Sequence, residues 1–468
     1  MRVSTSFLAA LAIVGLCHAQ QQRKAEDIYG QYCSACHGAK FEGGMGGSLV
    51  DGQWKHGSTD AAIYQSIAKG NLELGMTPWE GTLTDKEIRS LVILLQEKEK
   101  QTLTKGIEFP KPSLKKVTET KLHEYRIESV VGKGLVRPWA IAFLHDGSKL
   151  VTERPGGLRV IRPDGTLDTK PVEGLPTIIE HGQGGLMEVA PHPDHAKNGW
   201  IYLGFADGEK GSTKCITAIV RGRIKNHNWT DNEWIYRPDP KFRSSAGVHF
   251  GTRIVFHKGY LFFPIGERGG MMAAQDLASP VGKVFRLHDD GRVPKDNPFV
   301  GRKDAIPAIW SYGHRNPQGL TMDPRDGSLY ATEHGPRGGD ELNLIRPGLN
   351  YGWPVVTYGM NYNGTPMVSI TEKEGIQPPL VHWTPSLAVC GLDFYTGDLF
   401  PEWKHDLISG ALAQQEVRRI RIRDGKVTEQ EIILKDIGRV RDVTGAPDGA
   451  IYVVLNGPDS IVRMVPAR

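Results

Sequence analysis

The stretch Asp326-Gly327-Ser328-Leu329-Tyr330-Ala331-Thr332 joins a tight turn to a short strand, and this pattern returns along most of the chain. An Asx-Gly pair between apolar runs is a strong β-hairpin signal, because both turn positions of the favoured hairpin require positive φ. The turns of this kind are Asp146-Gly147, Asn198-Gly199, Lys258-Gly259, Asp326-Gly327 and Asp448-Gly449. The strands expected after them are Lys149–Thr152, Trp200–Phe205, Tyr260–Ile265, Ser328–Thr332 and Ala450–Leu455, with a weaker sixth copy at Asp406–Leu412.

The spacing of these copies predicts the architecture. They lie roughly 45 to 80 residues apart, which suits four-stranded blades with loop insertions. Six copies predict an all-β six-bladed β-propeller over residues 122–468. A pair of β-sandwiches is the alternative fold for such a set of hairpins.

Residues 20–100, ahead of the propeller, are helical in pattern, with helices expected at Ala25–Tyr32, Thr59–Lys69 and Thr84–Lys98. They contain Cys33-Ser34-Ala35-Cys36-His37, the signature of covalently attached haem c. A redox CxxC pair and a zinc half-site are the alternatives. In the haem interpretation Cys33 and Cys36 form thioethers and His37 is the proximal iron ligand. Met76 is the expected sixth ligand, and Met45, in a glycine-rich run, is its competitor. The unit resembles a class I cytochrome c domain, a small all-α fold.

The segments that flank this unit also have expected roles. Residues 101–121 carry lysines, threonines and prolines without an apolar period, and are expected to be a linker. Residues 1–19 are expected to be a signal peptide, because a short apolar core follows Arg2 and precedes Cys17-His18-Ala19. A lipid anchor on Cys17 is the alternative. We therefore expect a periplasmic or secreted protein with no transmembrane segment.

Net charge and cysteine content bear on the expected binding partners and on disulfide formation. A formal charge of +4 over 468 residues gives no reason to expect nucleic acid. Of the five cysteines, Cys215 and Cys390 are left after the signal and the haem motif, and buried free thiols are favoured over a disulfide.

Polar residues stand just before the first apolar stretch of several repeats, in the same register. They are Gln183, His249, Arg315, Asn316, Arg439 and Arg441. Equivalent positions of a propeller meet at one end of the central channel, so we expect these residues to form one pocket. Glu267 and Gly335-Pro336 follow the second strands of their repeats and are expected at the same mouth.

The chemistry of this set suggests a redox site. Several arginines suggest a ligand with several carboxylates or phosphates, and a histidine among them suggests a general base. A haem unit in the same chain suggests that the reaction releases electrons. No Rossmann glycine fingerprint stands in a βαβ setting, which disfavours nicotinamide and flavin.

From about residue 125 to 468 the chain resembles the PQQ-dependent soluble glucose dehydrogenases and aldose sugar dehydrogenases, the glucose/sorbosone dehydrogenase family. The matching stretches are Gly182–Leu186, His249–Arg253, Ile265–Glu267, Gly313–Leu320, Glu333–Pro336, Asp340–Asn343, Asn350–Pro354 and Arg439–Asp442. The resemblance implies that His249 takes the proton from the C1 hydroxyl of an aldose while the C1 hydride passes to PQQ, which gives a lactone. It also implies that Glu267 orients His249, although the family usually has aspartate there.

The resemblance implies ligand-binding roles for the other residues. Gln183 would border PQQ and substrate. The residues that would hold PQQ are Arg315, Asn316, Arg439 and Arg441. The carbonyls of Gly335 and Pro336 would bind a Ca²⁺ beside the quinone, and Glu341 with the carbonyl of Tyr351 would bind a second, structural Ca²⁺. One departure is Ala413, which stands where glucose dehydrogenases of the family have a lysine on PQQ.

We therefore expect an exported quinoprotein dehydrogenase whose electrons pass to haem c and then to a downstream acceptor, a cytochrome or another respiratory component. Two alternatives stay open. One is a non-catalytic propeller that docks a partner and carries an electron-transfer cytochrome. The other is a haem-dependent propeller reductase, a class whose propellers have eight blades.

Overall fold

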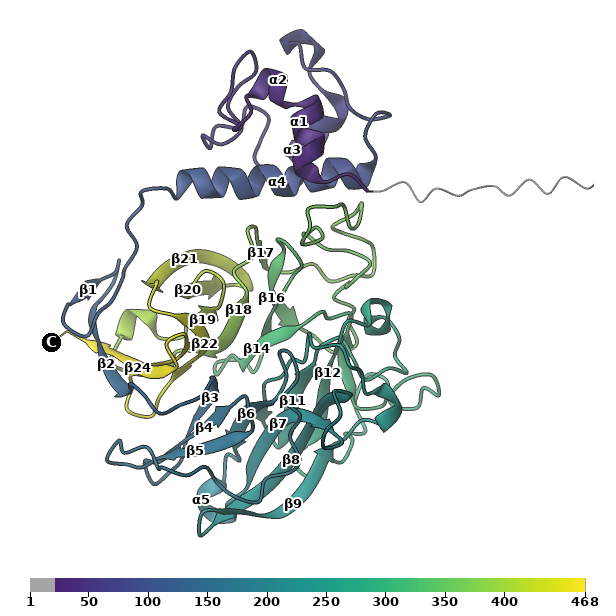
Figure 1. Ribbon diagram of the computed structural model, residues 1–468. Helices are drawn as coiled ribbons and strands as arrows, with labels where there is room; N and C mark the ends of the chain where they lie inside the picture. Colours follow the sequence, from purple (N-terminus) through teal and green to yellow (C-terminus); the bar gives the residue numbers. More distant parts are fainter. Residues whose placement is uncertain (1–21, 468) are drawn as a thin grey trace, which may run out of the picture.

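The computed structural model describes residues 22–467. Six antiparallel sheets form the larger part, and a group of helices lies against one end of it (Figure 1). The signal peptide expected at residues 1–19, with Cys17, falls outside the described residues. Within residues 22–467, no helix has the length and apolar character needed to cross a membrane.

The six sheets are the blades of a β-propeller, numbered here in chain order. Blade 1 is β3 (Pro138–Phe143), β4 (Lys149–Glu153) and β5 (Gly157–Ile161). Blade 2 is β6 (Leu186–Pro191), β7 (Ile201–Gly208), β8 (Cys215–Lys225) and β9 (Asn228–Tyr236). Blade 3 is β10 (Val255–His257), β11 (Tyr260–Ile265), β12 (Lys283–His288) and β13 (Ile309–Tyr312). Blade 4 is β14 (Pro317–Met322), β15 (Leu329–Glu333), β16 (Asp340–Ile345) and β17 (Val381–Trp383). Blade 5 is β18 (Val389–Phe394), β19 (Leu407–Ala411), β20 (Glu416–Arg423) and β21 (Lys426–Lys435).

Blade 6 closes the ring. It consists of β22 (Arg439–Gly445), β23 (Ile451–Asn456), β24 (Ser460–Pro466), β2 (Glu124–Val131) and β1 (Thr118–Glu119). The last strand of the chain, β24, pairs antiparallel with β2, the first long strand of the propeller. Six sheets confirm the six-bladed propeller, and each predicted second strand begins within one residue of its predicted start.

The turns are in the predicted places, but our reason for them was wrong. The glycines have positive φ, for example 78° at Gly327, whereas Asp146, Asn198, Asp326 and Asp448 do not. Only Lys258 among the residues before these glycines has a positive φ. The Asx side chains instead accept a backbone N–H two residues ahead, as Asp326 does from Ser328 at 2.8 Å. These are Asx turns, in which the side chain replaces a backbone acceptor.

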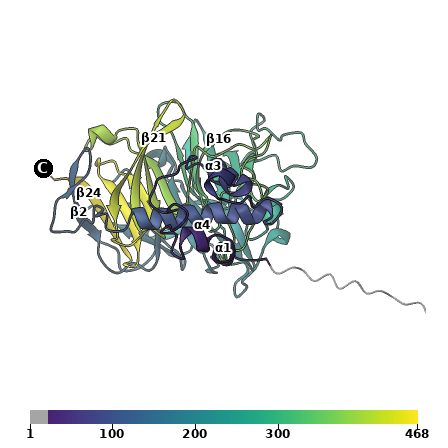
Figure 2. The same ribbon diagram turned by 90° about the horizontal axis from the view of Figure 1, so that it is seen from above.

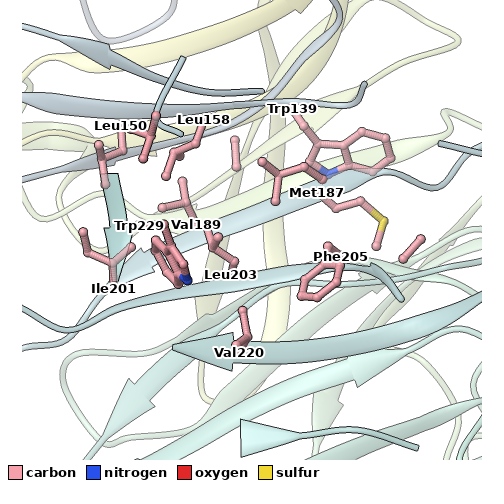
Figure 3. Close-up of a cluster of buried hydrophobic side chains, with 14 of the residues drawn as sticks. Trp139, Leu150, Leu158, Met187, Val189, Ile201, Leu203, Phe205, Val220 and Trp229 are labelled. Carbon is pink, nitrogen blue, oxygen red and sulfur yellow. The ribbon is translucent and has the colours of Figure 1, made fainter. Parts of the chain in front are cut away.

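Apolar side chains from neighbouring blades interlock between the sheets. Between blades 1 and 2, Trp139 and Leu158 face Met187 and Leu203 (Figure 3). Strands buried on both faces, such as β7, carry nearly continuous apolar runs rather than an alternating pattern. This packing fixes the inner strands, whose first residues carry the site described below.

The helical unit, residues 22–103, contains four helices and one short 3₁₀ turn. They are α1 (Ala25–Tyr32), α2 (Ser34–His37), α3 (Asp60–Lys69), η1 (Leu72–Leu74) and α4 (Asp85–Leu103). Thr84 caps α4 in a reciprocal capping box with Glu87. α1, α3 and α4 lie where helices were predicted, and α4 runs five residues beyond the predicted end. The short elements of the propeller are α5 (His195–Asn198), η2 (Pro240–Phe242), η3 (Met271–Ala274) and η4 (Pro401–Trp403).

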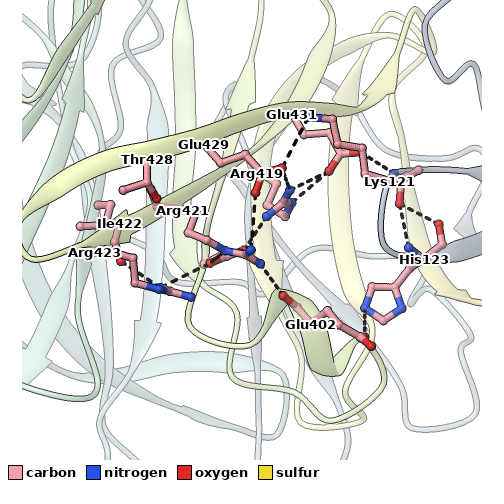
Figure 4. Close-up of polar contacts among 12 residues, drawn as sticks. Lys121, His123, Glu402, Arg419, Arg421, Ile422, Arg423, Thr428, Glu429 and Glu431 are labelled. Carbon is pink, nitrogen blue, oxygen red and sulfur yellow. Dashed lines mark hydrogen bonds and ion pairs between the residues drawn. The ribbon is translucent and has the colours of Figure 1, made fainter.

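The segment predicted as a linker is attached to the propeller over its second half. We call residues 104–117 the strap. Its Pro110 carbonyl accepts the Lys435 N–H at 2.8 Å, and Pro112 is buried. Just beyond the strap, the Lys121 N–H donates to Glu431, and Glu431 also pairs with the fully buried Arg419 of blade 5 (Figure 4). Two runs of the strap are exposed, residues 105–108 between α4 and the Pro110 contact and residues 114–117 just before β1.

α4 is buried on opposite faces. Ile88 and Leu91 pack in the core of the helical unit. On the other side, Glu97 pairs with Arg337 of blade 4. Seen from above, the helical unit lies over the propeller and α4 crosses it (Figure 2).

Candidate active site

Side chains from four blades meet at one end of the propeller, which we call the site rim. Gln183 precedes β6 and His249 precedes β10. The Gln183 carbonyl Oε1 accepts the His249 backbone N–H at 2.9 Å, and the Asn316 Oδ1 accepts the Gly251 N–H at 3.2 Å. The backbone of Glu267 donates to the Arg315 carbonyl at 2.8 Å. The structure therefore brings together residues that are up to 133 positions apart (Gln183 to Asn316).

His249 and Glu267 form a hydrogen-bonded pair. The Nδ1 of His249 contacts Oε1 of Glu267, and the other carboxylate oxygen accepts the Met271 N–H. The Glu267 side chain is 1% exposed and the His249 side chain 13% exposed. Because Glu267 binds Nδ1, the Nε2 of His249 is left as the proton acceptor. The glutamate in place of the family's aspartate thus reaches the histidine.

The surroundings favour the neutral form of His249. Burial lowers the pKa of His249, and the positive charge of Arg315 lowers it further, while the hydrogen bond that Nδ1 donates to Glu267 raises it in part. The net pKa lies below the usual value of 6.5. A neutral imidazole can accept a proton, so the site supplies a base near neutral pH.

Backbone geometry also shapes this corner. His249 has a φ of 53°, which few side chains adopt. A Cβ on Gly266 would lie 2.3 Å from the His249 carbonyl oxygen, so only glycine fits there. The chain therefore approaches itself closely where His249 is presented.

Three arginines of the site rim lack carboxylate partners. Arg315 donates to the Gly335 carbonyl at 2.6 Å, and its Nε is buried without any partner among residues 22–467. Arg441 donates to the Asn456 side chain at 3.2 Å and stacks on Trp139. Arg439 is exposed, and no carboxylate of the described chain pairs with it. Buried guanidinium groups without anions fit a ligand with several carboxylates, such as PQQ.

A fully buried ion triad lies beneath these arginines. Arg253 pairs with Glu188 and with Asp442, each at 3.0 Å, and so joins blades 2 and 6. Its guanidinium also donates to the Arg441 carbonyl at 2.9 Å, and Cys390 donates to the same carbonyl at 2.8 Å. The triad thereby fixes the backbone that carries Arg441. Cys390 on β18 and Cys215 on β8 are both buried free thiols.

The structure adds residues to which the sequence assigned no role. Arg268 stacks on Phe250 at 3.4 Å, and burial lowers its pKa to about 10. His334 donates through Nε2 to the Val389 carbonyl at 2.7 Å, and burial lowers its pKa to about 3. Its Nδ1 faces the Asn316 amide at 3.4 Å, so the neutral ring orients Asn316. In the sequence, Arg268 and His334 are marked only by their positions next to Glu267 and Gly335.

The two expected calcium sites differ. At the first, the Gly335 carbonyl accepts from the Arg315 guanidinium and the Pro336 carbonyl accepts from the Ser386 hydroxyl at 3.0 Å. The Arg315 guanidinium, a cation, already binds the Gly335 carbonyl that would ligate the metal. This arrangement therefore does not fit Ca²⁺. Within residues 22–467, no three His, Cys, Asp or Glu side chains form a metal-ligating group.

At the second site the ligand chemistry fits. Glu341 is half-buried beside the buried Glu333, and both carboxylates accept from Asn343, at 3.1 and 3.0 Å. Burial and the Glu333 charge raise the pKa of Glu341 well above its usual range. Glu341 and Tyr351 line a cavity of about 340 Å³. Lys373 lines this cavity together with Glu372 and Glu374, but no salt bridge of the described residues uses the Glu341 carboxylate, and free oxygen ligands of this kind suit Ca²⁺.

The lysine position of blade 5 offers no replacement for the missing charge. The Ala413 N–H donates to the Leu387 carbonyl at 3.0 Å. The nearby Lys435 ammonium donates to the Gln414 carbonyl and pairs with Glu416. Its hydrogen bonds are thus used within blade 5.

The helical unit fits a covalent haem. Nδ1 of His37 lies 2.8 Å from the Gly47 carbonyl oxygen, so this nitrogen donates and Nε2 keeps its lone pair for iron. Cys33 and Cys36 are free thiols on either side of the start of α2. Met76 is half-buried in a turn closed by two hydrogen bonds with Asn71, whereas Met45 is 87% exposed. These differences favour Met76 as the second axial ligand, and its pairing with His37 stays a prediction.

The sequence pattern of the Glucose / Sorbosone dehydrogenase family matches residues 135–463, which include His249, Arg315 and Arg441. The chain belongs to this family. A second pattern, that of the cbb3-type cytochrome c oxidase subunit III, matches residues 20–95. The chain is thus a glucose/sorbosone dehydrogenase family member with a cytochrome c domain, and we call residues 22–103 the cytochrome unit.

Relatives of the dehydrogenase domain agree with the fold. Aldose sugar dehydrogenase YliI of Escherichia coli (strain K12) is 44% identical over 328 residues, covering 68% of this chain and 87% of that protein. A crystal structure of the soluble E. coli aldose sugar dehydrogenase in its apo-form superposes with a TM-score of 0.69 at 39% identity, covering 73% of this chain and 99% of that one. A PQQ-bound aldose sugar dehydrogenase from Streptomyces coelicolor superposes with a TM-score of 0.60 at 26% identity, covering 73% and 98%.

Proposed function

We propose that this protein is an exported, PQQ-dependent aldose sugar dehydrogenase that oxidises the C1 hydroxyl of an aldose to a lactone and passes the electrons to its own haem c. The observation that carries the proposal is the His249–Glu267 pair with Arg315 and Arg441 nearby, two arginines that have no carboxylate partners. That set supplies a base and anion-binding groups at one rim of the propeller. The similarity to PQQ-bound and aldose-oxidising relatives supports the same assignment.

The residues of the site rim divide the work. His249, neutral and held through Nδ1 by Glu267, accepts the C1 hydroxyl proton at Nε2. Glu267 keeps the ring in this orientation and stabilises the imidazolium that forms. Arg315, Arg439 and Arg441 would bind the carboxylates of the cofactor, and Asn316 and Gln183 would supply further polar contacts to cofactor and sugar.

Oxidation of one sugar to a lactone removes two electrons and two protons. PQQ, when bound, supplies the two-electron oxidant for the C1 hydride, and haem c, when bound, carries electrons singly to an external one-electron acceptor. The first proton leaves through His249. A soluble cytochrome or a respiratory component is the expected acceptor, and a periplasmic or secreted location would suit covalent haem attachment.

Removal of the haem attachment separates the two half-reactions. In a Cys33→Ala, Cys36→Ala variant loaded with PQQ, we expect sugar oxidation with an artificial dye acceptor to stay within about twofold of the wild type. Oxidation coupled to an external cytochrome should be lost. A panel of aldoses added to the wild type, with haem absorbance followed, identifies the substrate.

Three other results would contradict the proposal. Equal loss with both acceptors would show that the thiols serve the propeller. No sugar-dependent haem reduction and no dye reduction in the PQQ-loaded wild type would favour the non-catalytic docking module. The alternative of a haem-dependent reductase conflicts with the six blades, because propellers of that class have eight. A measured content of two haems per chain would be needed to support that alternative.

We expect Ca²⁺ to stabilise the protein through Glu341. Added Ca²⁺ should raise the unfolding temperature of the propeller, because it would offset the repulsion between the neighbouring Glu341 and Glu333 carboxylates. Glu341→Gln should abolish this shift and should raise the unfolding temperature in EDTA. The measurement is thermal unfolding of PQQ-free protein with Ca²⁺ or EDTA. The exposed carboxylate of Glu233 provides the control Glu233→Gln, which should keep the Ca²⁺ shift. An unchanged shift in Glu341→Gln would remove the site.

A further inference from the structure

The contact between the cytochrome unit and the propeller is centred on Arg337. Its guanidinium pairs with Glu97 of α4 at 2.8 Å and with Glu26 of α1 at 2.7 Å. Its Nε also donates to both carboxylate oxygens of Glu97, at 3.2 and 3.1 Å. Glu97 is 6% exposed, so the pair is largely removed from water. A two-pronged Arg–carboxylate contact of this kind fixes orientation as well as distance.

Apolar and backbone contacts surround this ion pair. Met360 of blade 4 is 0% exposed and belongs to the hydrophobic core of the cytochrome unit, so the propeller contributes a side chain to that core. The Ala25 N–H donates across the contact to the Gly364 carbonyl at 2.9 Å. A Cβ on Gly338 would lie 3.3 Å from the Ile93 side chain of α4. The contact therefore has the buried apolar element of a permanent interface.

The same turn of blade 4 reaches the site rim. Arg315 donates to the Gly335 carbonyl, and two residues later Arg337 binds the cytochrome unit. The Arg337 and Met360 backbones exchange two hydrogen bonds of 2.9 Å, so the turn and the Met360 loop move as one piece. Residues 335–338 thus join the cofactor pocket to α4 within four residues.

We propose that the cytochrome unit is docked permanently on blade 4 and that Arg337 is its docking residue. The electron acceptor then keeps one position beside the site rim and does not swing on a linker. This inference rests on the proposed function. The partner of the blade 4 surface is residues 22–103 of the same chain. The attached strap agrees with this, because the chain already binds the propeller at Pro110 and the exposed run before that contact is only residues 105–108, shorter than a swinging domain would need.

Glu97→Gln in the full-length, haem-loaded chain tests the docking residue from the cytochrome side. Glu80→Gln is the matched control, since Glu80 pairs with Lys69 on the exposed surface of the same unit. With PQQ and an aldose, we expect Glu97→Gln to slow haem reduction at least tenfold in stopped flow, and dye reduction and the control to stay within twofold. In PQQ-free protein, hydrogen exchange in the peptide that contains Ala25 should quicken at least tenfold in Glu97→Gln alone.

A second variant tests the fixed position directly. Ten Gly/Ser residues inserted between Gly106 and Ile107 lengthen the exposed part of the connection. A docked unit keeps its haem-reduction rate within twofold, whereas the rate of a swinging unit falls as its effective concentration drops. A clear fall, or a Glu97→Gln variant that matches the wild type in both rate and exchange, would overturn the inference. Equal loss of haem and dye reduction in Glu97→Gln would also overturn it, because the effect would then lie in the cofactor pocket. Absence of haem reduction in the wild type would instead reject the proposed function.

Discussion

His249→Gln should lower the rate of sugar oxidation with a dye acceptor by about 10²- to 10⁴-fold, the usual contribution of a general base. Glutamine can fill the space and can still contact Glu267, but its amide does not accept a proton at these pH values. Binding of PQQ should change little, because the arginines of the site rim are untouched. The measurement is steady-state dye reduction at saturating PQQ, with PQQ affinity measured separately by fluorescence.

The pH profile gives a second readout of the same residue. The wild-type rate should fall as pH falls through the pKa of His249, below 6.5, because the protonated imidazole cannot act as a base. This acid limb should be absent from the residual activity of His249→Gln. His257→Gln, at the outer end of β10, is the control and should retain both the rate and the limb. More than a third of wild-type activity in His249→Gln would exclude this histidine as the base.

Arg253→Met should destabilise the propeller by about 3–5 kcal/mol, because it leaves two buried carboxylates without their cation. Methionine is close to arginine in length, so the loss measures charge more than packing. The urea midpoint of tryptophan fluorescence in the full-length chain reports the change. Arg302→Met is the control, since both side chains of the Arg302–Asp304 pair are exposed and its loss should leave the urea midpoint nearly unchanged.

The loss in Arg253→Met should depend on pH with a defined sign. Burial already raises the pKa values of Glu188 and Asp442, and removal of Arg253 should raise them further. Between the unfolded and the raised folded pKa values the folded state binds more protons, so stability falls as pH rises. The variant should therefore be closer to wild type at pH 5 than at pH 8. A loss that is equal at both pH values would mean that packing, and not charge, dominates.

The sequence predicted the propeller well because its signals are local. Each hairpin turn is a short Asx-Gly segment before an apolar strand, and Gly327 illustrates why the glycine is required at φ 78°. The error lay in the aspartates, whose side chains complete the turn without a positive φ. The end of α4 was placed too early because residues 99–102 are polar, yet a helix can continue over a solvated turn.

The site residues were predicted from their shared register in the repeats, and register also limits what could be predicted about them. Register places Gln183, His249 and Asn316 at one rim, and these residues do contact one another through the 247–251 backbone. It cannot reveal which partner a long side chain selects. Arg253, for example, pairs with Glu188 and Asp442, which belong to two other blades. The Arg337 contact between two domains has no local pattern at all.

The pairing of β2 with β24 has a consequence for the making of this protein. Synthesis delivers the cytochrome unit first, whereas the surface that receives it, around residues 337–364, appears more than 200 residues after α4. The ring itself closes only when the final strand arrives. Ile93 and Glu97 therefore have no partner on the propeller until that surface has been made. Docking of the cytochrome unit and closure of the ring both wait for the later part of the chain.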